Sequence, residues 1–185
     1  MTARKMQTNE PGALIITGDA LEGELVLNLS EWKLDNPDFV DALFSSNNHF
    51  GYHKIWRVKG YDLYRLLAEA GLREVPGTTV TFVASDGFSY TETLESLTAR
   101  CCFPDLTAGS EEPAMPMIVL YSALMFDEQD PRPPVFWKAR PLTEADYDRQ
   151  RPRMMMGQRK DDPSDDNQAY FVGDMVKIVV GKEQE

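Results

Sequence analysis

The chain has 185 residues, of which 42% are hydrophobic and 26% charged. These values suit one folded domain with a substantial core. Thirty acidic residues against 19 basic ones give a formal net charge of -11. An acidic surface repels phosphate backbones, which argues against a nucleic-acid partner.

The sequence shows the pattern of neither a membrane span nor a secretory signal. No apolar run approaches the ~20 residues that a membrane span needs, so we expect a soluble protein. Residues 1–12 are polar and lack the hydrophobic stretch of a secretory signal, and we expect them to be flexible. A cytoplasmic protein and an exported one whose signal has been removed both fit this pattern.

The first predicted elements are two strands. Residues 14–17 form an apolar run that ends at turn-forming residues, and residues 25–29 alternate with period two. A short turn follows at residues 31–34. Residues 37–43 begin with a proline after a capping asparagine, which is compatible with a helix or a wide loop.

The segment from Ser45 to His53 is polar, contains Gly51 and carries both histidines of the chain, the second being His49. Polar residues around a glycine are typical of a loop, and we expect one here. Residues 54–58 predict a short strand.

The clearest predicted helix runs from Tyr61 to Ala70. Its leucines, Leu63, Leu66 and Leu67, recur at the spacing that places them on one helical face. Gly71 follows the last periodic residue, where a left-handed C-terminal cap is expected.

A β-hairpin is predicted next. Residues 80–84 alternate with period two, Asp86 and Gly87 supply a tight turn with positive φ angles, and Phe88 and Tyr90 continue on the return strand. We expect the leucine face of the helix to pack in the core against this hairpin.

The second half of the chain gives fewer signals. Cys101 and Cys102 are adjacent, which favours two buried or strand thiols over a disulfide. Residues 117–121 form an apolar run typical of a buried strand, residues 127–152 are proline-rich and irregular, and residues 175–180 predict a closing strand. The predicted class is therefore α+β, mainly β with one clear helix.

Three segments in this order resemble the molybdopterin-binding domain of the sulfite-oxidase superfamily. They are Gly60-Tyr61-Asp62-Leu63 with Leu66-Leu67, the stretch from Val80 to Phe88, and Pro152 to Gly157 ahead of the strand from Val176 to Val180. The resemblance spans residues 13–181 as one domain, with residues 182–185 left as a tail. It implies that family's fold and a cleft for molybdopterin or another pterin.

One position departs from the family pattern. The family's cysteine, whose thiolate binds molybdenum, corresponds to Ser45 in Leu43-Phe44-Ser45-Ser46-Asn47-Asn48, while Asn48 matches the family's asparagine. An alcohol ionises far less readily than a thiol and is a weaker ligand. We therefore expect no bound metal, no catalytic residue and no sulfite-oxidase-type activity.

Three functions are compatible with this departure. The first is a non-redox domain that binds a pterin or small organic anion through Ser45, Asn47, Asn48, His49 and Arg153. Arg153 would pair with a phosphate of the ligand. Each of these side chains could instead be structural, since loop asparagines usually satisfy turn backbone and an arginine on an acidic protein usually meets an aspartate.

The second function is a molybdenum oxidoreductase with Ser45 or water among the ligands. The third is a protein-interaction module without a small ligand, in which the run Met154-Met155-Met156 forms an adaptable contact surface. A buried core strand is the plainer interpretation of that run. No nucleophile elbow or phosphate-binding glycine loop is present, so hydrolase and nucleotide-binding functions are not favoured.

Overall fold

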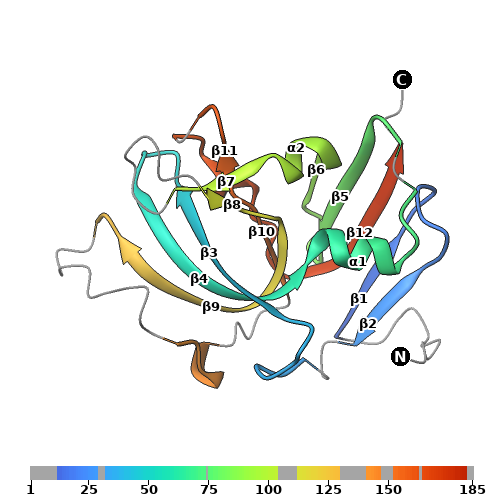
Figure 1. Ribbon diagram of the computed structural model, residues 1–185, viewed down its shortest axis with the longest axis horizontal. Helices are drawn as coiled ribbons and strands as arrows, with labels where there is room; N and C mark the ends of the chain where they lie inside the picture. The colour runs from blue at the N-terminus through green and yellow to red at the C-terminus, as the bar shows by residue number, and fades with distance from the viewer. Residues whose placement is uncertain are drawn as a thin grey trace.

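Three β-sheets make up most of the fold in a computed structural model of the chain (Figure 1). The structure describes residues 12–28, 32–73, 75–103, 112–129, 141–146, 152–162 and 164–182. The expectations of a flexible segment at residues 1–12 and a tail at 182–185 fall almost wholly outside these ranges. Strands dominate the described residues, which confirms the prediction of a mainly β fold.

The five-stranded sheet joins the two ends of the chain. Its order is β2 (Leu25–Asn28), β1 (Ala13–Thr17), β12 (Met175–Lys182), β5 (Thr78–Ala84) and β6 (Ser89–Thr93). The β1–β12 pair is parallel and the other pairs are antiparallel. Alternate residues of β1 and β5 are buried, so one face of this sheet packs on the core.

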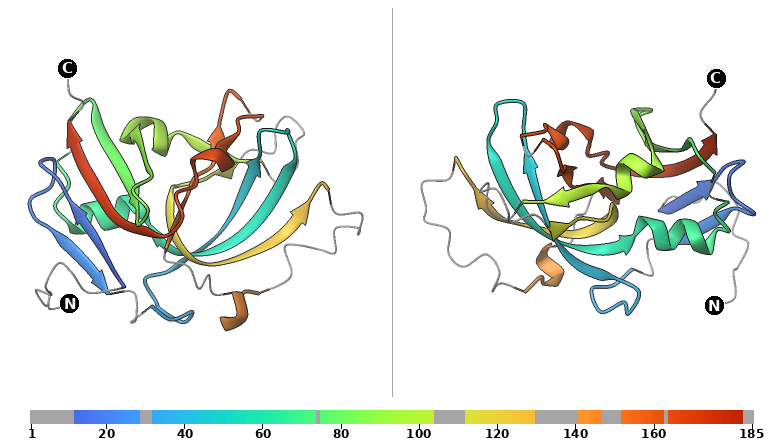
Figure 2. Two further views of the ribbon diagram at one scale, coloured as in Figure 1. Left: turned by 180° about the vertical axis from the view of Figure 1, so that it is seen from behind. Right: turned by 45° about the horizontal axis from the view of Figure 1, so that its top comes forward.

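The four-stranded sheet is long and strongly curved (Figures 1 and 2). Its order is β10 (Arg153–Met155), β9 (Met117–Asp127), β4 (His53–Asp62) and β3 (Val40–Asn47), and all pairs are antiparallel. β3 is an edge strand of this sheet, so its outer backbone groups are not used by the ladder.

A small third sheet packs against the four-stranded one. It consists of β11 (Gln158–Arg159), β7 (Arg100–Cys102) and β8 (Glu112–Pro113). Side chains from both sheets share one hydrophobic cluster, made of Phe44, Val58, Cys102, Ala114, Met117, Val119 and Met155. Its apolar packing fixes the small sheet in place.

The helix α1 (Leu63–Glu69) begins two residues later than expected, because Tyr61 and Asp62 belong to β4. The Asp62 side chain accepts a hydrogen bond from the Arg65 backbone N–H at 2.9 Å, which caps the first turn. Gly71 has a φ of 76°, the left-handed conformation that a glycine adopts after a helix. A second helix, α2 (Leu94–Thr98), was not predicted and is only five residues long.

The larger core cluster confirms that the helix leucines and the hairpin residues lie in one core. Leu66 and Leu67 of α1 lie in the same cluster as Val80 and Phe82 of β5, and each is at most 1% exposed. The short helices η3 (Glu144–Asp146) and η4 (Asn167–Tyr170) lie outside the sheets. No helix in the described ranges is both long and apolar enough to cross a membrane.

Four further expectations from the sequence were wrong. Residues 40–43 are neither helix nor loop, because they begin β3, and the predicted loop at residues 45–53 is confined to residues 48–52. Of the Asp86–Gly87 turn, only Gly87 has a positive φ, at 90°. Irregular structure does not begin at Asp127, because β9 includes this residue. The rest of the 127–152 segment is described only at residues 128–129, 141–146 and 152.

Candidate functional site

Ser45 lies within β3 and has no exposed surface. Its hydroxyl accepts a hydrogen bond from the Phe103 backbone N–H at 2.7 Å and donates one to the Gln158 side-chain oxygen. This serine therefore connects three segments of the chain. Its hydroxyl proton is already used within the protein.

Asn167 makes a second set of bonds at the same place. This buried residue of η4 donates from Nδ2 to the carbonyl oxygens of Ser45 and Met156, both at 3.0 Å. Its Oδ1 accepts a hydrogen bond from the Asn47 backbone N–H at 3.0 Å. The end of the β3 edge is thus paired with a side chain instead of another strand, which satisfies backbone groups that would be costly to bury alone.

His53 belongs to the same buried polar region. Its Nδ1 lies 3.3 Å from Asn47 Oδ1, and its backbone N–H donates to Glu128 Oε2 at 2.9 Å. Burial lowers the pKa of His53, although the negative charge of Glu128 opposes this shift. Asn47 and His53 therefore stabilise the start of the β3–β4 hairpin.

The other two predicted residues of this segment lie in the hairpin turn. Asn48 Oδ1 accepts hydrogen bonds from the backbone N–H groups of Phe50 and Tyr52, both at 3.1 Å. The ring centroids of His49 and Phe50 lie 3.7 Å apart, and Phe50 is 70% exposed. Asn48 thus has the turn-stabilising role that asparagines commonly have in loops.

Arg153 lies on β10, the far edge strand of the four-stranded sheet. It pairs with Val119 of β9, Val119 pairs with Gly60 of β4, and Gly60 pairs with Val40 of β3. Arg153 is therefore in register with Val40 across the sheet. Its strand, β10, is separated from β3 by the two strands β9 and β4. Directly paired residues point to the same face, so Arg153 shares the face of Val119, which belongs to the cluster around Phe44.

Cys102 is the neighbour of Ser45 that the sequence did not indicate. Both cysteines are buried residues of β7, as expected, and neither forms a disulfide. The Cys102 thiol lies within hydrogen-bonding reach of Ser45, and burial raises the pKa of this thiol despite that contact. Among the described residues there is no group of three or more histidine, cysteine or acidic side chains that could hold a metal ion.

The Met154-Met155-Met156 run does not form a contact surface, because its three side chains are at most 1% exposed. The plainer interpretation, a core strand, is confirmed for Met154 and Met155 in β10.

A groove runs along β3 beside this buried polar region. We name it the β3 groove; its volume is about 540 Å³. It is lined by Val40, Asp41, Ala42, Leu43, Phe44, Arg57, Asp62, Cys102, Glu112, Pro113, Ala114, Met115 and Met117. Arg57 donates two hydrogen bonds to the Asp41 carboxylate, at 3.0 and 2.9 Å, so the positive charge of this groove is paired.

Four residues of this region were not predicted from the sequence to belong to a functional site: Cys102, Gln158, Asn167 and Glu112. None of them belongs to a recognisable motif, and the contacts of the first three with the Ser45 strand join residues distant in sequence. Periodicity within a local window contains no information about such contacts.

Comparison with known proteins does not assign a family. No family model matches the chain, and no curated protein sequence does. Among solved structures, the chain is similar to the sulfane dehydrogenase SoxCD from Paracoccus pantotrophus, with 14% sequence identity and a TM-score of 0.49. The alignment covers 98% of this chain but 40% of that one, so the chain spans less than half of its length.

Proposed function

We propose that the chain is a non-redox binding domain that holds a pterin, such as molybdopterin or a simpler relative, in the β3 groove. The observation that supports this most is the state of Ser45. Its hydroxyl is fully buried and bonded to Phe103 and Gln158, whereas the groove beside it is open. In this proposal the ligand occupies the β3 groove, and the Ser45 hydroxyl takes no part in binding a metal.

The size and lining of the β3 groove suit a flat heterocycle. Small-molecule sites typically have volumes of about 300–1,000 Å³ and apolar walls with a few polar groups. Val40, Leu43 and Met115 provide accessible apolar wall, and Asp41, Asp62 and Glu112 provide carboxylates.

A single carboxylate can recognise the pterin ring. The aminopyrimidine edge of a pterin presents two neighbouring N–H donors, and one carboxylate can accept both, as it does from an arginine. Asp41 is paired with Arg57, and Asp62 caps α1. Glu112 is therefore the carboxylate that we assign to the ring.

None of the five residues predicted from the sequence lines the β3 groove, and Arg153 is retained only as a contact for a part of the ligand that extends beyond the groove. It lies on the same face of the four-stranded sheet as the cluster around Phe44. A phosphate on the ligand would pair with its guanidinium group. Ser45, Asn47, Asn48 and His49 keep structural roles in this proposal.

Titration with 6-hydroxymethylpterin, followed by its fluorescence, tests the proposal. Glu112→Gln should weaken binding by about tenfold or more, because a hydrogen bond to a charged group contributes about 1.5–3 kcal/mol. Glu95→Gln is the matched control, since Glu95 lies outside the β3 groove. Equal affinities for all three proteins would contradict the assignment of Glu112, and no binding by any of them would contradict the function.

A second candidate, a protein-interaction module, is favoured by the open edge of β3. Ser45 O and Asn47 N point away from β4, toward Asn167. Because backbone groups alternate along a strand, those of Asp41 and Leu43 point to the same side, into the groove. No described strand pairs with this edge, so an extended peptide could add to the sheet here.

Leu43→Pro distinguishes this candidate from pterin binding. Proline would remove an outward N–H without breaking a hydrogen bond to β4. In a screen of displayed peptides, binders of the native protein should be lost on the variant if an added strand is the ligand. Binders that are retained on Leu43→Pro would exclude strand addition at this edge.

A further inference from the structure

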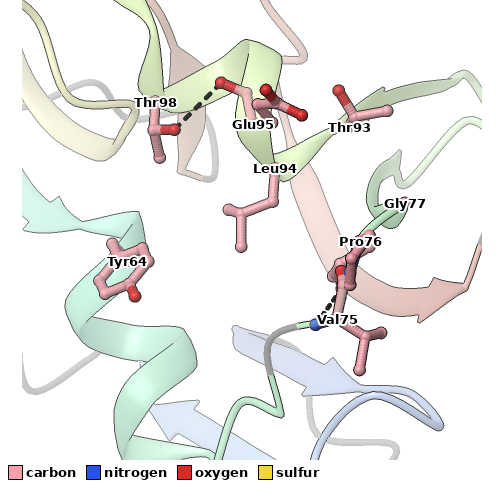
Figure 3. A pocket seen from close by; sticks show the side chains of 9 residues that line it. Tyr64, Val75, Pro76, Gly77, Thr93, Leu94, Glu95 and Thr98 are labelled. Atoms are coloured by element: carbon pink, nitrogen blue, oxygen red, sulfur yellow. Dashed lines mark hydrogen bonds between the residues drawn. The ribbon is translucent and has the colours of Figure 1, made fainter.

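A second groove lies between the two helices. We name it the α1–α2 groove; its volume is about 640 Å³, and it shares no lining residue with the β3 groove. Tyr64 of α1 forms one wall, the turn at residues 75–77 forms another, and Leu94, Glu95 and Thr98 of α2 complete it (Figure 3).

The apolar part of the α1–α2 groove is accessible. Leu94 points into the space, and only 6% of it is exposed, so it forms a floor (Figure 3). Tyr64 is 36% exposed and Val75 37%, although both are large hydrophobic residues. Together these side chains offer an aromatic ring and aliphatic groups to an apolar body of modest size.

The polar part consists mainly of acceptors. The Thr78 hydroxyl donates to the Val75 carbonyl at 2.7 Å, and the Thr98 hydroxyl donates to the Glu95 carbonyl at 3.0 Å. Each hydroxyl proton is used. The Thr98 oxygen keeps its lone pairs to accept, whereas the Thr78 oxygen also accepts from the Val75 N–H at 3.3 Å and keeps one lone pair. Glu95 is the one charged side chain among the described residues that line the groove.

We propose that the α1–α2 groove binds a small organic amine with an aromatic or apolar body. An ammonium group carries donors and a positive charge, which complement the threonine oxygens and the Glu95 carboxylate. The body of the ligand would cover Leu94 and Val75, and the cation would also be attracted by the face of the Tyr64 ring. The net charge of -11 on the chain favours the approach of cations over anions.

An NMR titration of the full chain with phenethylamine tests this proposal. The expected result is a saturable shift of the backbone amides at residues 75–78 and 93–98. The neutral analogue 2-phenylethanol should bind about tenfold more weakly or worse, because it lacks the charged hydrogen bond. Raising the salt concentration should weaken amine binding, since Glu95 lies at an open site.

Matched variants separate this site from the β3 groove. Glu95→Gln keeps the shape of the side chain and removes its charge, and it should weaken phenethylamine binding by about tenfold or more. Glu112→Gln should leave amine binding unchanged. Equal binding of the amine and the alcohol, or full affinity in Glu95→Gln, would overturn the proposal. Failure here would leave the pterin proposal intact, because the two grooves have no residue in common.

Discussion

Replacing Ser45 with alanine tests whether this residue holds the fold together. The substitution removes a hydroxyl that accepts from the Phe103 N–H at 2.7 Å and donates to Gln158. A buried polar group left without its partner costs about 1–3 kcal/mol. Two such groups are affected, so we expect the free energy of unfolding to fall by roughly 2–4 kcal/mol.

Urea unfolding followed by circular dichroism measures this loss. The midpoint should fall at unchanged slope, because a loss of stability shifts the midpoint while the slope reports the surface exposed on unfolding. Ser89→Ala is the matched control, because Ser89 is an exposed residue of β6 and should change stability by less than about 0.5 kcal/mol. A Ser45→Ala protein as stable as the control would refute the structural role that we assign to the hydroxyl.

Four further predictions concern other parts of the chain. Leu66→Ala should lower the free energy of unfolding by about 2–5 kcal/mol, because this side chain is only 1% exposed in the core. Urea unfolding measures this loss of stability, and a negligible loss would contradict the packing. Although burial opposes it, hydrogen bonds from Ser96, Tyr90 and Arg100 hold the pKa of Glu92 below its ordinary value near 4.5. The stability that Glu92 contributes is therefore present above that value and lost as the pH falls through the lower folded pKa, so Glu92→Gln should reduce the acid sensitivity of the thermal midpoint. Arg153→Ala should weaken binding of a phosphorylated pterin by roughly 1.5–3 kcal/mol but leave an unphosphorylated one unaffected, as calorimetry can measure. Elemental analysis of protein from molybdenum-supplemented cells should find no stoichiometric molybdenum, and one atom per chain would favour the altered-ligation alternative.

The sequence predicts the elements that local patterns determine. The α1 helix has leucines at helical spacing and a terminal glycine, and the β5–β6 hairpin has alternation on both sides of Asp86–Gly87. These signals lie within about ten residues of one another and need no distant partner. Both elements and the burial of their apolar faces in one core are accordingly predictable.

The β3 strand could not be predicted in the same way. Residues 45–47 are polar, and polar residues near a glycine predict a loop. They are buried in a strand because their partners are supplied from far along the chain. Gln158 lies 113 residues from Ser45, and Asn167 lies 122 residues from it. The β7 and β8 strands have only three and two residues, too few for any periodicity to appear.

The environment of Ser45 also explains why a thiolate would be poorly placed there. Cys102 occupies the same buried region, and burial raises the pKa of its thiol even though Ser45 offers it a hydrogen bond. A thiol at position 45 would experience the same low polarity, which disfavours the charged form that a metal requires. It would also bond more weakly than a hydroxyl to the Phe103 N–H and to Gln158. The serine thus fits a position with a structural role, and our proposal assigns recognition of a ligand to the groove beside it.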